Sequence, residues 1–95
     1  MKRLFVYGSL KSSGSAHHLL KGAERDSDGI LDGFIEIQHR GYPMLRRGDG
    51  AISGEVYWVP DACWTALDAW EEVPEMYQRT SVTLRDGRET LVYMG

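Results

Sequence analysis

The hydrophobic positions of the 95-residue chain fall in short runs separated by glycine-containing turns, which is a pattern typical of β-strands. Residues 4–7 predict a buried first strand that Gly8 and Ser9 end. A second strand is expected near residues 30–38, because apolar or small residues recur there at every second position. The residues that would share one face of that strand are Leu31, Gly33, Ile35 and Ile37.

A hairpin is expected in the middle of the chain. It would join residues 44–46 to residues 51–59 around the Gly-Asp-Gly turn at 48–50. Within the longer arm, Gly54 predicts a bulge or a close approach of another backbone. The side chains expected to alternate inward in that arm are Ile52, Val56 and Trp58.

Two helices and a second hairpin complete the predicted elements. A short helix is expected at residues 16–21, and the main helix runs from Pro60 to about Glu72. The hairpin would join residues 77–85 to residues 88–94 through an Asp-Gly turn, the strongest short-range hairpin signal.

The composition fits one compact domain. Hydrophobic residues make up 42% of the chain, which is enough for a core, and 95 residues are too few for two domains. We therefore predict a single α+β domain spanning residues 1–95. It would consist of a curved mixed or antiparallel sheet that forms a small β-barrel, with one main helix and one short helix.

Charge and cysteine content limit which classes of partner and which compartment can be expected. The net charge is -3 and no basic run exceeds two residues, which argues against nucleic acid or an anionic membrane as the partner. No stretch approaches the roughly 18 apolar residues of a membrane-spanning helix. A single cysteine, Cys63, cannot form an internal disulfide, so a reducing compartment is expected. These features predict a cytoplasmic protein, either a monomer or a weak homodimer.

One acidic residue of the main helix falls on its apolar side. At about 100° per residue, Trp64 and Leu67 define an apolar stripe, and Glu71 lies along it. The stripe also contains Cys63 and Trp70, and the opposite side contains Asp61, Thr65, Asp68 and Glu72. Burial raises the pKa of a carboxyl group, which suits a general acid/base near neutral pH. The alternatives are an ion pair with Arg79 or a side chain that reaches water at the helix end.

The turn after the first strand is the second candidate for chemistry. It reads Tyr7-Gly8-Ser9-Leu10 and lies between a buried strand and a short helix. Gly8 lets the backbone approach a ligand closely, and the N–H groups after it could form a nest that binds anions. An ordinary strand end is the alternative, because a lone Gly-Ser is a weak signal.

No metal and no organic cofactor are expected. His17 and His18 are adjacent, so on a helix their side chains diverge by about 100°, and His39 is distant in sequence. Cys63 has no sequence signature of a nucleophile and is expected to pack in the core.

Several motifs recur in a fixed order along the chain. Residues 5–11 read Phe-Val-Tyr-Gly-Ser-Leu-Lys, and residues 67–71 read Leu-Asp-Ala-Trp-Glu. The landmarks around them are His17-His18-Leu19-Leu20, Tyr42-Pro43, Gly54-Glu55-Val56-Tyr57 and Tyr77-Gln78-Arg79. In this order and spacing the chain resembles the gamma-glutamylcyclotransferase-like superfamily, and most closely its gamma-glutamylamine cyclotransferase branch.

The resemblance implies a small β-barrel with flanking helices and a cofactor-independent enzyme of the transferase or lyase type. Glu71 would be the proton acceptor, and Tyr7, Gly8, Ser9 and Leu10 would hold the glutamyl group of a small-molecule substrate. The implied reaction is intramolecular aminolysis, in which the α-amine attacks the γ-carbonyl and releases 5-oxoproline. The leaving group would be an amine or an amino acid.

The chain departs from the family pattern in two places. Residues 11–14 read Lys-Ser-Ser-Gly where the family usually has Lys/Arg-x-Gly, and the sequence ends one residue after Met94. We expect the rim of the pocket to differ there.

Two other functions remain open at this stage. One is a non-catalytic small-molecule binding or regulatory module on the same fold, and the other is a structural domain in which Glu71 pairs with Arg79. An open pocket or a closed ion pair at Glu71 distinguishes them.

Overall fold

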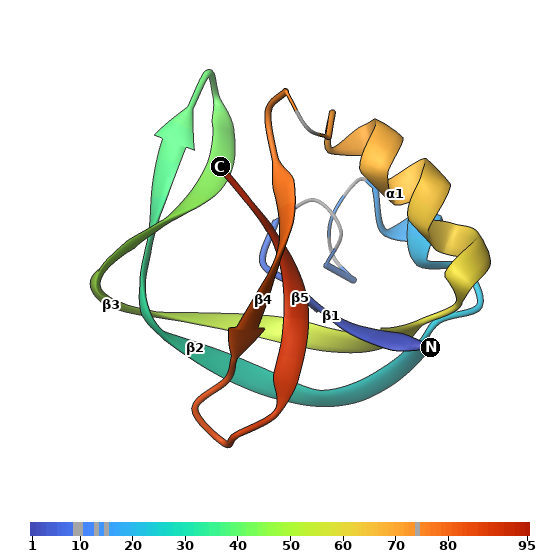
Figure 1. Cartoon of the computed structure of the whole chain (residues 1–95), viewed down its shortest axis with the longest axis horizontal. Helices are drawn as coiled ribbons and strands as arrows, with labels where there is room; N and C mark the ends of the chain where they lie inside the picture. The colour runs from blue at the N-terminus through green and yellow to red at the C-terminus, as the bar shows by residue number, and fades with distance from the viewer. Residues whose placement is uncertain (9–10, 13, 15, 74) are drawn as a thin grey trace.

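The computed structural model describes residues 1–8, 11–12, 14, 16–73 and 75–95 of the chain (Figure 1). Its elements in chain order are β1 (Lys2–Val6), the 3-10 helix η1 (His17–Leu20), β2 (Glu24–His39), β3 (Tyr42–Val59), the 3-10 helix η2 (Asp61–Cys63), α1 (Trp64–Trp70), β4 (Gln78–Thr83) and β5 (Glu89–Met94). None of the described helices is long and apolar enough to cross a membrane.

The five strands form one mixed sheet in the order β2-β3-β1-β5-β4. Neighbouring strands are antiparallel except β1 and β5, which run parallel where Leu4 pairs with Leu91. The predicted α+β class with a mixed sheet is therefore confirmed. The sheet does not close into a barrel, since β2 and β4 are its two edges among the described residues.

Hydrophobic side chains pack on both faces of the sheet, because successive residues of a strand point to opposite sides. In β1, Leu4 and Val6 belong to one cluster and Phe5 to the other. The first cluster contains Leu4, Val6, Ala16, Leu20, Met44, Tyr57, Val59, Trp64, Leu67, Tyr77 and Tyr93. The second contains Phe5, Leu31, Phe34, Leu45, Val56, Val82, Leu84 and Val92. Both α1 and η1 thus pack on the face that carries the first cluster.

The predicted hairpin around residues 48–50 is wrong. β3 runs without a turn through these residues, and the hairpin instead joins β2 to β3 through Arg40 and Gly41. These two residues have φ values of 53° and 82°, as a type I′ turn requires. A Cβ on Gly50 would lie 2.7 Å from the carbonyl oxygen of Phe34, so glycine here permits close strand packing.

The predicted inner face of the second strand is also wrong beyond Leu31. A register shift separates Asp32 from Phe34, and Gly33 adopts a positive φ of 83° at this bulge. Phe34 is consequently buried, whereas the side chain of Ile35 is 38% exposed. A single inserted residue has therefore reversed the alternation that the sequence pattern predicted.

The other predicted elements exist with changed limits. Two predictions for glycines are confirmed. Another part of the chain closely approaches Gly54, because a Cβ there would lie 2.6 Å from Phe5 Cζ. Gly87 lies in the turn of the β4–β5 hairpin with a φ of 94°. The main helix is shorter than predicted, because it divides into η2 and α1 and ends at Trp70. Trp70, expected on the apolar stripe, is 49% exposed.

Candidate active site

Glu71 is the residue that caps the C-terminal end of α1. Its backbone N–H donates to the carbonyl of Leu67 at 3.0 Å, which keeps the last helical turn closed. Its side chain is mostly withdrawn from water, and this burial raises the pKa of Glu71 from 4.5 to about 7. In the part of the chain that the structure describes, no hydrogen bond or ion pair to its carboxylate is present. The group therefore divides between its two protonation states near neutral pH.

Two tyrosines lie within electrostatic range of Glu71. Burial raises the pKa of Tyr7 far above its usual range, and the nearby Tyr77 and Glu71 raise it further. Burial and then the contact with Asp68 raise the pKa of Tyr93, and the charge of Glu71 adds to the effect. Both phenols therefore stay neutral across the pH range in which Glu71 titrates.

Fixed hydrogen bonds hold these phenols in place. Tyr7 donates its hydroxyl to the carbonyl of Tyr93 at 2.6 Å, and Tyr77 donates to the carbonyl of Pro43 at 2.7 Å. The hydroxyl of Tyr93 donates to Asp68 Oδ1 at 2.7 Å. These three tyrosines thus come from the residue after β1, from β5 and from the residue before β4, which only the sheet order brings together.

The ion pair between Glu71 and Arg79, which was the alternative to a catalytic role, is not found among the described residues. Arg79 instead pairs with Asp68, with 3.2 Å between Nε and Oδ1, and its guanidinium lies 4.9 Å from the ring centre of Trp64. Asp68 was expected to face solvent, but α1 turns it toward β4 and β5, where both Arg79 and Tyr93 reach it. Asp68 therefore forms the ion pair with Arg79, and the carboxyl group of Glu71, three residues later, is desolvated.

The loop after β1 is described in part. Tyr7 and Gly8 lie within the described residues, whereas Ser9 and Leu10, also predicted to bind substrate, lie outside them. The N–H of Lys11 donates to the carbonyl of Gly8 at 3.0 Å and closes a turn. A Cβ on Gly8 would lie 3.1 Å from Pro43 Cγ, so an added methyl group would require a shift of a few tenths of an ångström.

Tyr93 and Asp68 are the site residues that sequence reasoning missed. Asp68 lies three residues before Glu71, and residues at that spacing are neighbours on a helix, which is the signal that could have linked them. Tyr93 carried no local signal, because its contact with Asp68 spans 25 residues.

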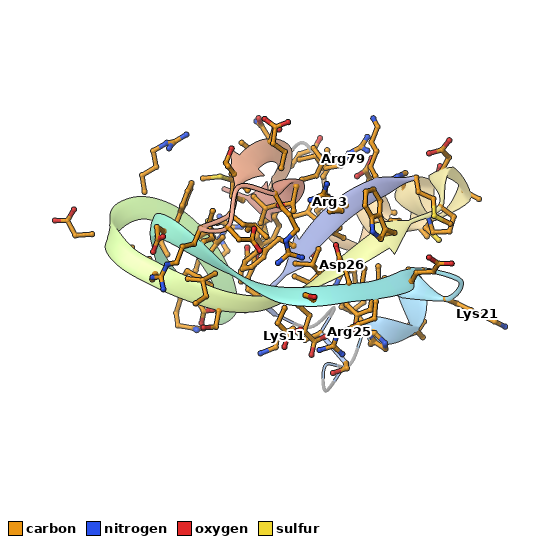
Figure 2. All side chains as sticks on the ribbon, turned by 90° about the horizontal axis from the view of Figure 1, so that it is seen from below. Arg3, Lys11, Lys21, Arg25, Asp26 and Arg79 are labelled. Carbon is orange, nitrogen blue, oxygen red and sulfur yellow. The ribbon has the colours of Figure 1, made fainter. Side chains whose placement is uncertain are left out.

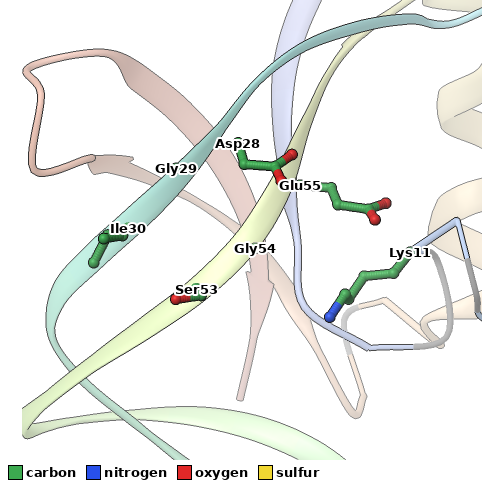
Figure 3. Close-up of a pocket in the computed structure, with 7 residues that line it drawn as sticks. All are labelled: Lys11, Asp28, Gly29, Ile30, Ser53, Gly54 and Glu55. Carbon is green, nitrogen blue, oxygen red and sulfur yellow. The ribbon is translucent and has the colours of Figure 1, made fainter.

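A cleft of about 400 Å³ lies beside Lys11, β2 and β3, and Glu71 is not among its lining residues. Its lining residues are Lys11, Asp28, Gly29, Ile30, Ser53, Gly54 and Glu55. Figures 2 and 3 show that Lys11 reaches from the loop toward β3, on the side of the molecule away from Arg79. Among the described residues, no group of three His, Cys, Asp or Glu side chains is placed to hold a metal.

Comparisons with known sequences agree on one family. The sequence model described as "Gamma-glutamyl cyclotransferase, AIG2-like" matches residues 4–95. "Gamma-glutamylcyclotransferase family protein YtfP" of Escherichia coli (strain K12) is 34% identical over 67 residues, which cover 70% of this chain and 59% of that protein. "Gamma-glutamylaminecyclotransferase C" of Danio rerio is 34% identical over 93 residues, covering 85% and 60%. The chain thus spans about three fifths of the length of these two curated relatives.

Solved structures show the same fold. A crystal structure of an AIG2-like protein from Mus musculus matches with a TM-score of 0.83 and 26% identity, over 100% of this chain and 77% of that one. Protein PH0828 from Pyrococcus horikoshii matches with a TM-score of 0.84 and 23% identity, over 99% and 77%.

Proposed function

The chain belongs to the AIG2-like gamma-glutamyl cyclotransferase family, and on this basis we propose that it cyclises the glutamyl group of a gamma-glutamyl amine or gamma-glutamyl amino acid and releases 5-oxoproline. The observation that carries the proposal is Glu71, a carboxylate whose burial raises its pKa to about 7 while Arg79 pairs elsewhere. A group that titrates near the working pH is suited both to accept and to return a proton.

In the proposed reaction the substrate's α-amino nitrogen attacks its own γ-carbonyl carbon. Glu71 accepts a proton from the amine, the new C–N bond closes a five-membered lactam, and the γ-amide C–N bond breaks. Glu71 then returns the proton to the departing nitrogen, so the carboxylate is regenerated in each cycle. Because both reacting groups belong to one molecule, holding the substrate folded contributes much of the acceleration.

The remaining roles are assigned to the loop after β1. Backbone N–H groups of residues 8–10 are suited to bind the α-carboxylate or the oxyanion that develops on the γ-carbonyl. The proton of the Tyr7 hydroxyl is already committed to the carbonyl of Tyr93. Tyr7 therefore serves as a wall and a hydrogen-bond acceptor in this proposal, and Glu71 alone moves protons.

A non-catalytic module that binds glutamyl compounds is the competing function. Such a binder must attract an anionic α-carboxylate, and an unpaired carboxylate beside the site opposes this attraction. Glu71 therefore favours catalysis over simple binding.

The test is an assay of 5-oxoproline release from a panel of gamma-glutamyl compounds. The panel should contain gamma-glutamyl amino acids, simple gamma-glutamyl amines and the isopeptide formed with the lysine side-chain nitrogen, with the Glu71→Gln variant in parallel. We expect turnover of at least one class by the wild type and none above background by the variant. Binding of these compounds without any release by the folded wild type would establish the competing function instead.

A further inference from the structure

Glu55 is a second carboxylate that the fold withdraws from water, and the proposed chemistry does not use it. It lies in β3 directly opposite Val6, the last residue of β1, and so marks the point where the loop of residues 8–14 leaves the sheet. Its exposed fraction is only 8%. Because a buried charge is unfavourable unless it is paired and hydrogen-bonded, the contacts of Glu55 indicate its purpose.

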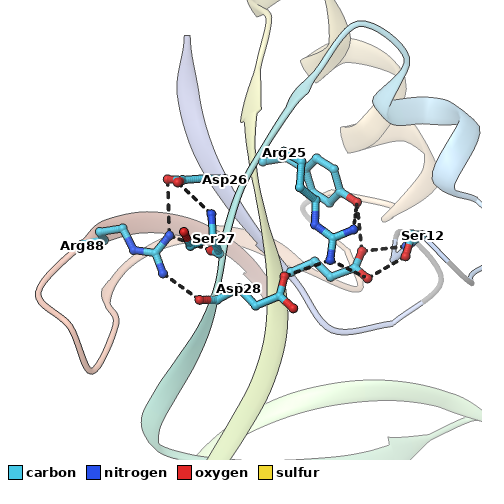
Figure 4. A network of polar contacts seen from close by, with 8 residues as sticks. Ser12, Arg25, Asp26, Ser27, Asp28 and Arg88 are labelled. Carbon is cyan, nitrogen blue, oxygen red and sulfur yellow. Dashed lines mark hydrogen bonds and ion pairs between the residues drawn. The ribbon is translucent and has the colours of Figure 1, made fainter.

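Both carboxylate oxygens of Glu55 accept hydrogen bonds from one residue of that loop, Ser12. Ser12 donates its backbone N–H to Oε1 at 2.7 Å and its hydroxyl to Oε2 at 2.7 Å. Figure 4 shows the contacts of Ser12 and Arg25 converging on the same carboxylate. Tyr57 donates its hydroxyl to Oε1 at 3.0 Å, and Arg25 forms an ion pair at 3.3 Å. The carboxylate is therefore fully partnered.

The contacts with Ser12 are the stronger part of this arrangement. Hydrogen bonds to a charged acceptor are about twice as strong as those between neutral groups. Arg25 is 46% exposed, and ion pairs at such exposed positions contribute little because water screens them. Burial acts to raise the pKa of Glu55, but the bonds from Ser12 and Tyr57 and the charge of Arg25 outweigh it and leave the pKa lowered. Glu55 thus stays ionised at neutral pH.

Ser12 is connected to the glutamyl-binding end of the loop by two successive turns. The N–H of Lys11 donates to the carbonyl of Gly8 at 3.0 Å, and the N–H of Gly14 donates to the carbonyl of Lys11 at 2.7 Å. Ser12 lies inside the second turn, so holding it to β3 also holds the turn that begins at Gly8. The described part of the loop is thus held at two points, by β1 at Val6 and by Glu55 at Ser12.

We propose that Glu55 is a positioning residue. By accepting hydrogen bonds from the backbone N–H and the hydroxyl of Ser12, it orients the loop after β1, which receives the glutamyl group in the proposed function. This inference rests on the proposed function, because it concerns the same substrate. It assigns no proton transfer to Glu55. Loss of the hydrogen bonds between Ser12 and Glu55 should therefore weaken substrate binding and leave the pKa of Glu71 unchanged.

Kinetics separate this role from general support of the fold. We expect Glu55→Ala to raise KM for a gamma-glutamyl substrate at least tenfold, with a smaller change in kcat and an unchanged pH inflection of the reaction. Glu55→Gln should recover most of the loss, because its amide oxygen still accepts from the Ser12 N–H. Ser12→Ala, which removes only the hydroxyl contact, should raise KM by a few fold. The matched control is Asp28→Ala, which removes the other partner of Arg25 and should leave both constants unchanged.

A measurement without substrate completes the test. The Ser12 amide should exchange with deuterium at least tenfold faster in Glu55→Ala than in the wild type, while the amides of β1 and β5 retain their protection. Unchanged exchange at Ser12 would overturn the proposal, as would an unchanged KM in an active enzyme. If Glu55→Ala does not fold, Glu55→Gln and Ser12→Ala carry the same comparison. If the wild type is inactive but the Ser12 amide exchanges faster in Glu55→Ala than in the wild type, the proposed function is refuted and the contact between Glu55 and Ser12 is upheld.

Discussion

Glu55 and Glu71 are both carboxylates withdrawn from water, yet the two sites hold them in opposite states. At Glu55, Ser12, Tyr57 and Arg25 together outweigh desolvation and lower the pKa. At Glu71, desolvation raises the pKa to about 7, and no contact from the described residues opposes it. Burial alone therefore does not decide the charge of a carboxyl group in this molecule. The hydrogen-bond donors and cations around the carboxyl group decide whether it is charged.

The difference has a structural cause. Glu55 lies within a central strand, where neighbouring strands and the adjoining loop present donors from several directions. Glu71 lies at the end of a helix of seven residues, and the cation nearest along this face, Arg79, pairs with Asp68 of the same helix. The surroundings of Glu55 keep its carboxylate ionised, whereas those of Glu71 allow its carboxyl group to gain and lose a proton near neutral pH.

The largest effect should follow from removing the titrating group. We expect Glu71→Gln to lower kcat/KM by about 10²–10⁴-fold, because the amide keeps the shape but cannot move a proton. The control is Glu72→Gln, an exposed neighbour that should retain full activity. A Glu71→Gln enzyme that turns over within tenfold of the wild type would remove Glu71 from the mechanism.

Enlarging Gly8 should have the next largest effect, since it disturbs the loop that Glu55 holds. A methyl group there would press against Pro43 Cγ, and a branched side chain would force the backbone to move. We expect Gly8→Ala to be mild and Gly8→Val to lower kcat/KM by about 10²-fold, the order expected when a displacement near 1 Å misplaces a substrate. Steady-state kinetics with circular dichroism as a folding control checks the series, and equal activity of the two variants would contradict it.

The pH dependence should report one carboxylate and not the other. Glu71 must be ionised to accept a proton, so kcat/KM should fall about tenfold per pH unit below its pKa of about 7. Because the pKa of Glu55 is lowered, Glu55→Gln should leave this inflection where it is. An inflection that moved with Glu55→Gln would show that the two sites are coupled.

The smallest effects, on stability, should have opposite signs. The folded protein binds a proton at Glu71 more tightly than the unfolded chain, so stability falls as pH rises from 4.5 to about 7 and the full penalty persists above that range. A shift of this size corresponds to at most about 3 kcal/mol. Because the side chain is only partly buried and the amide is itself polar, Glu71→Gln should be stabilising by about 1–2 kcal/mol at pH 8 and nearly neutral at pH 4. Glu55→Gln should be destabilising by about 1–2 kcal/mol at neutral pH, since it loses charged hydrogen bonds.

Denaturant unfolding of both variants at the two pH values measures these changes. A Glu71→Gln variant that loses stability at pH 8 would indicate an unrecognised partner for the carboxylate.

Elements with strong local signals could be predicted from the sequence. The Asp86-Gly87 hairpin, the β1 strand and the close approach at Gly54 are present as predicted, because turn chemistry and short-range alternation determine them. The face of β2 beyond Leu31 was not predictable in this way, because the bulge at Gly33 reverses it.

For the candidate site, the sequence by itself determined that Glu71 follows the apolar positions of α1 and that a glycine ends the run after β1. Helical and strand periodicity are local properties, so they can be read from neighbouring residues. Only the tertiary structure decided the partners: Arg79 pairs with Asp68, and Glu55 meets Ser12 across 43 residues of chain. Whether a buried carboxylate stays charged depends on donors that other strands and loops bring to it, and the order of the strands in the sheet sets which donors arrive.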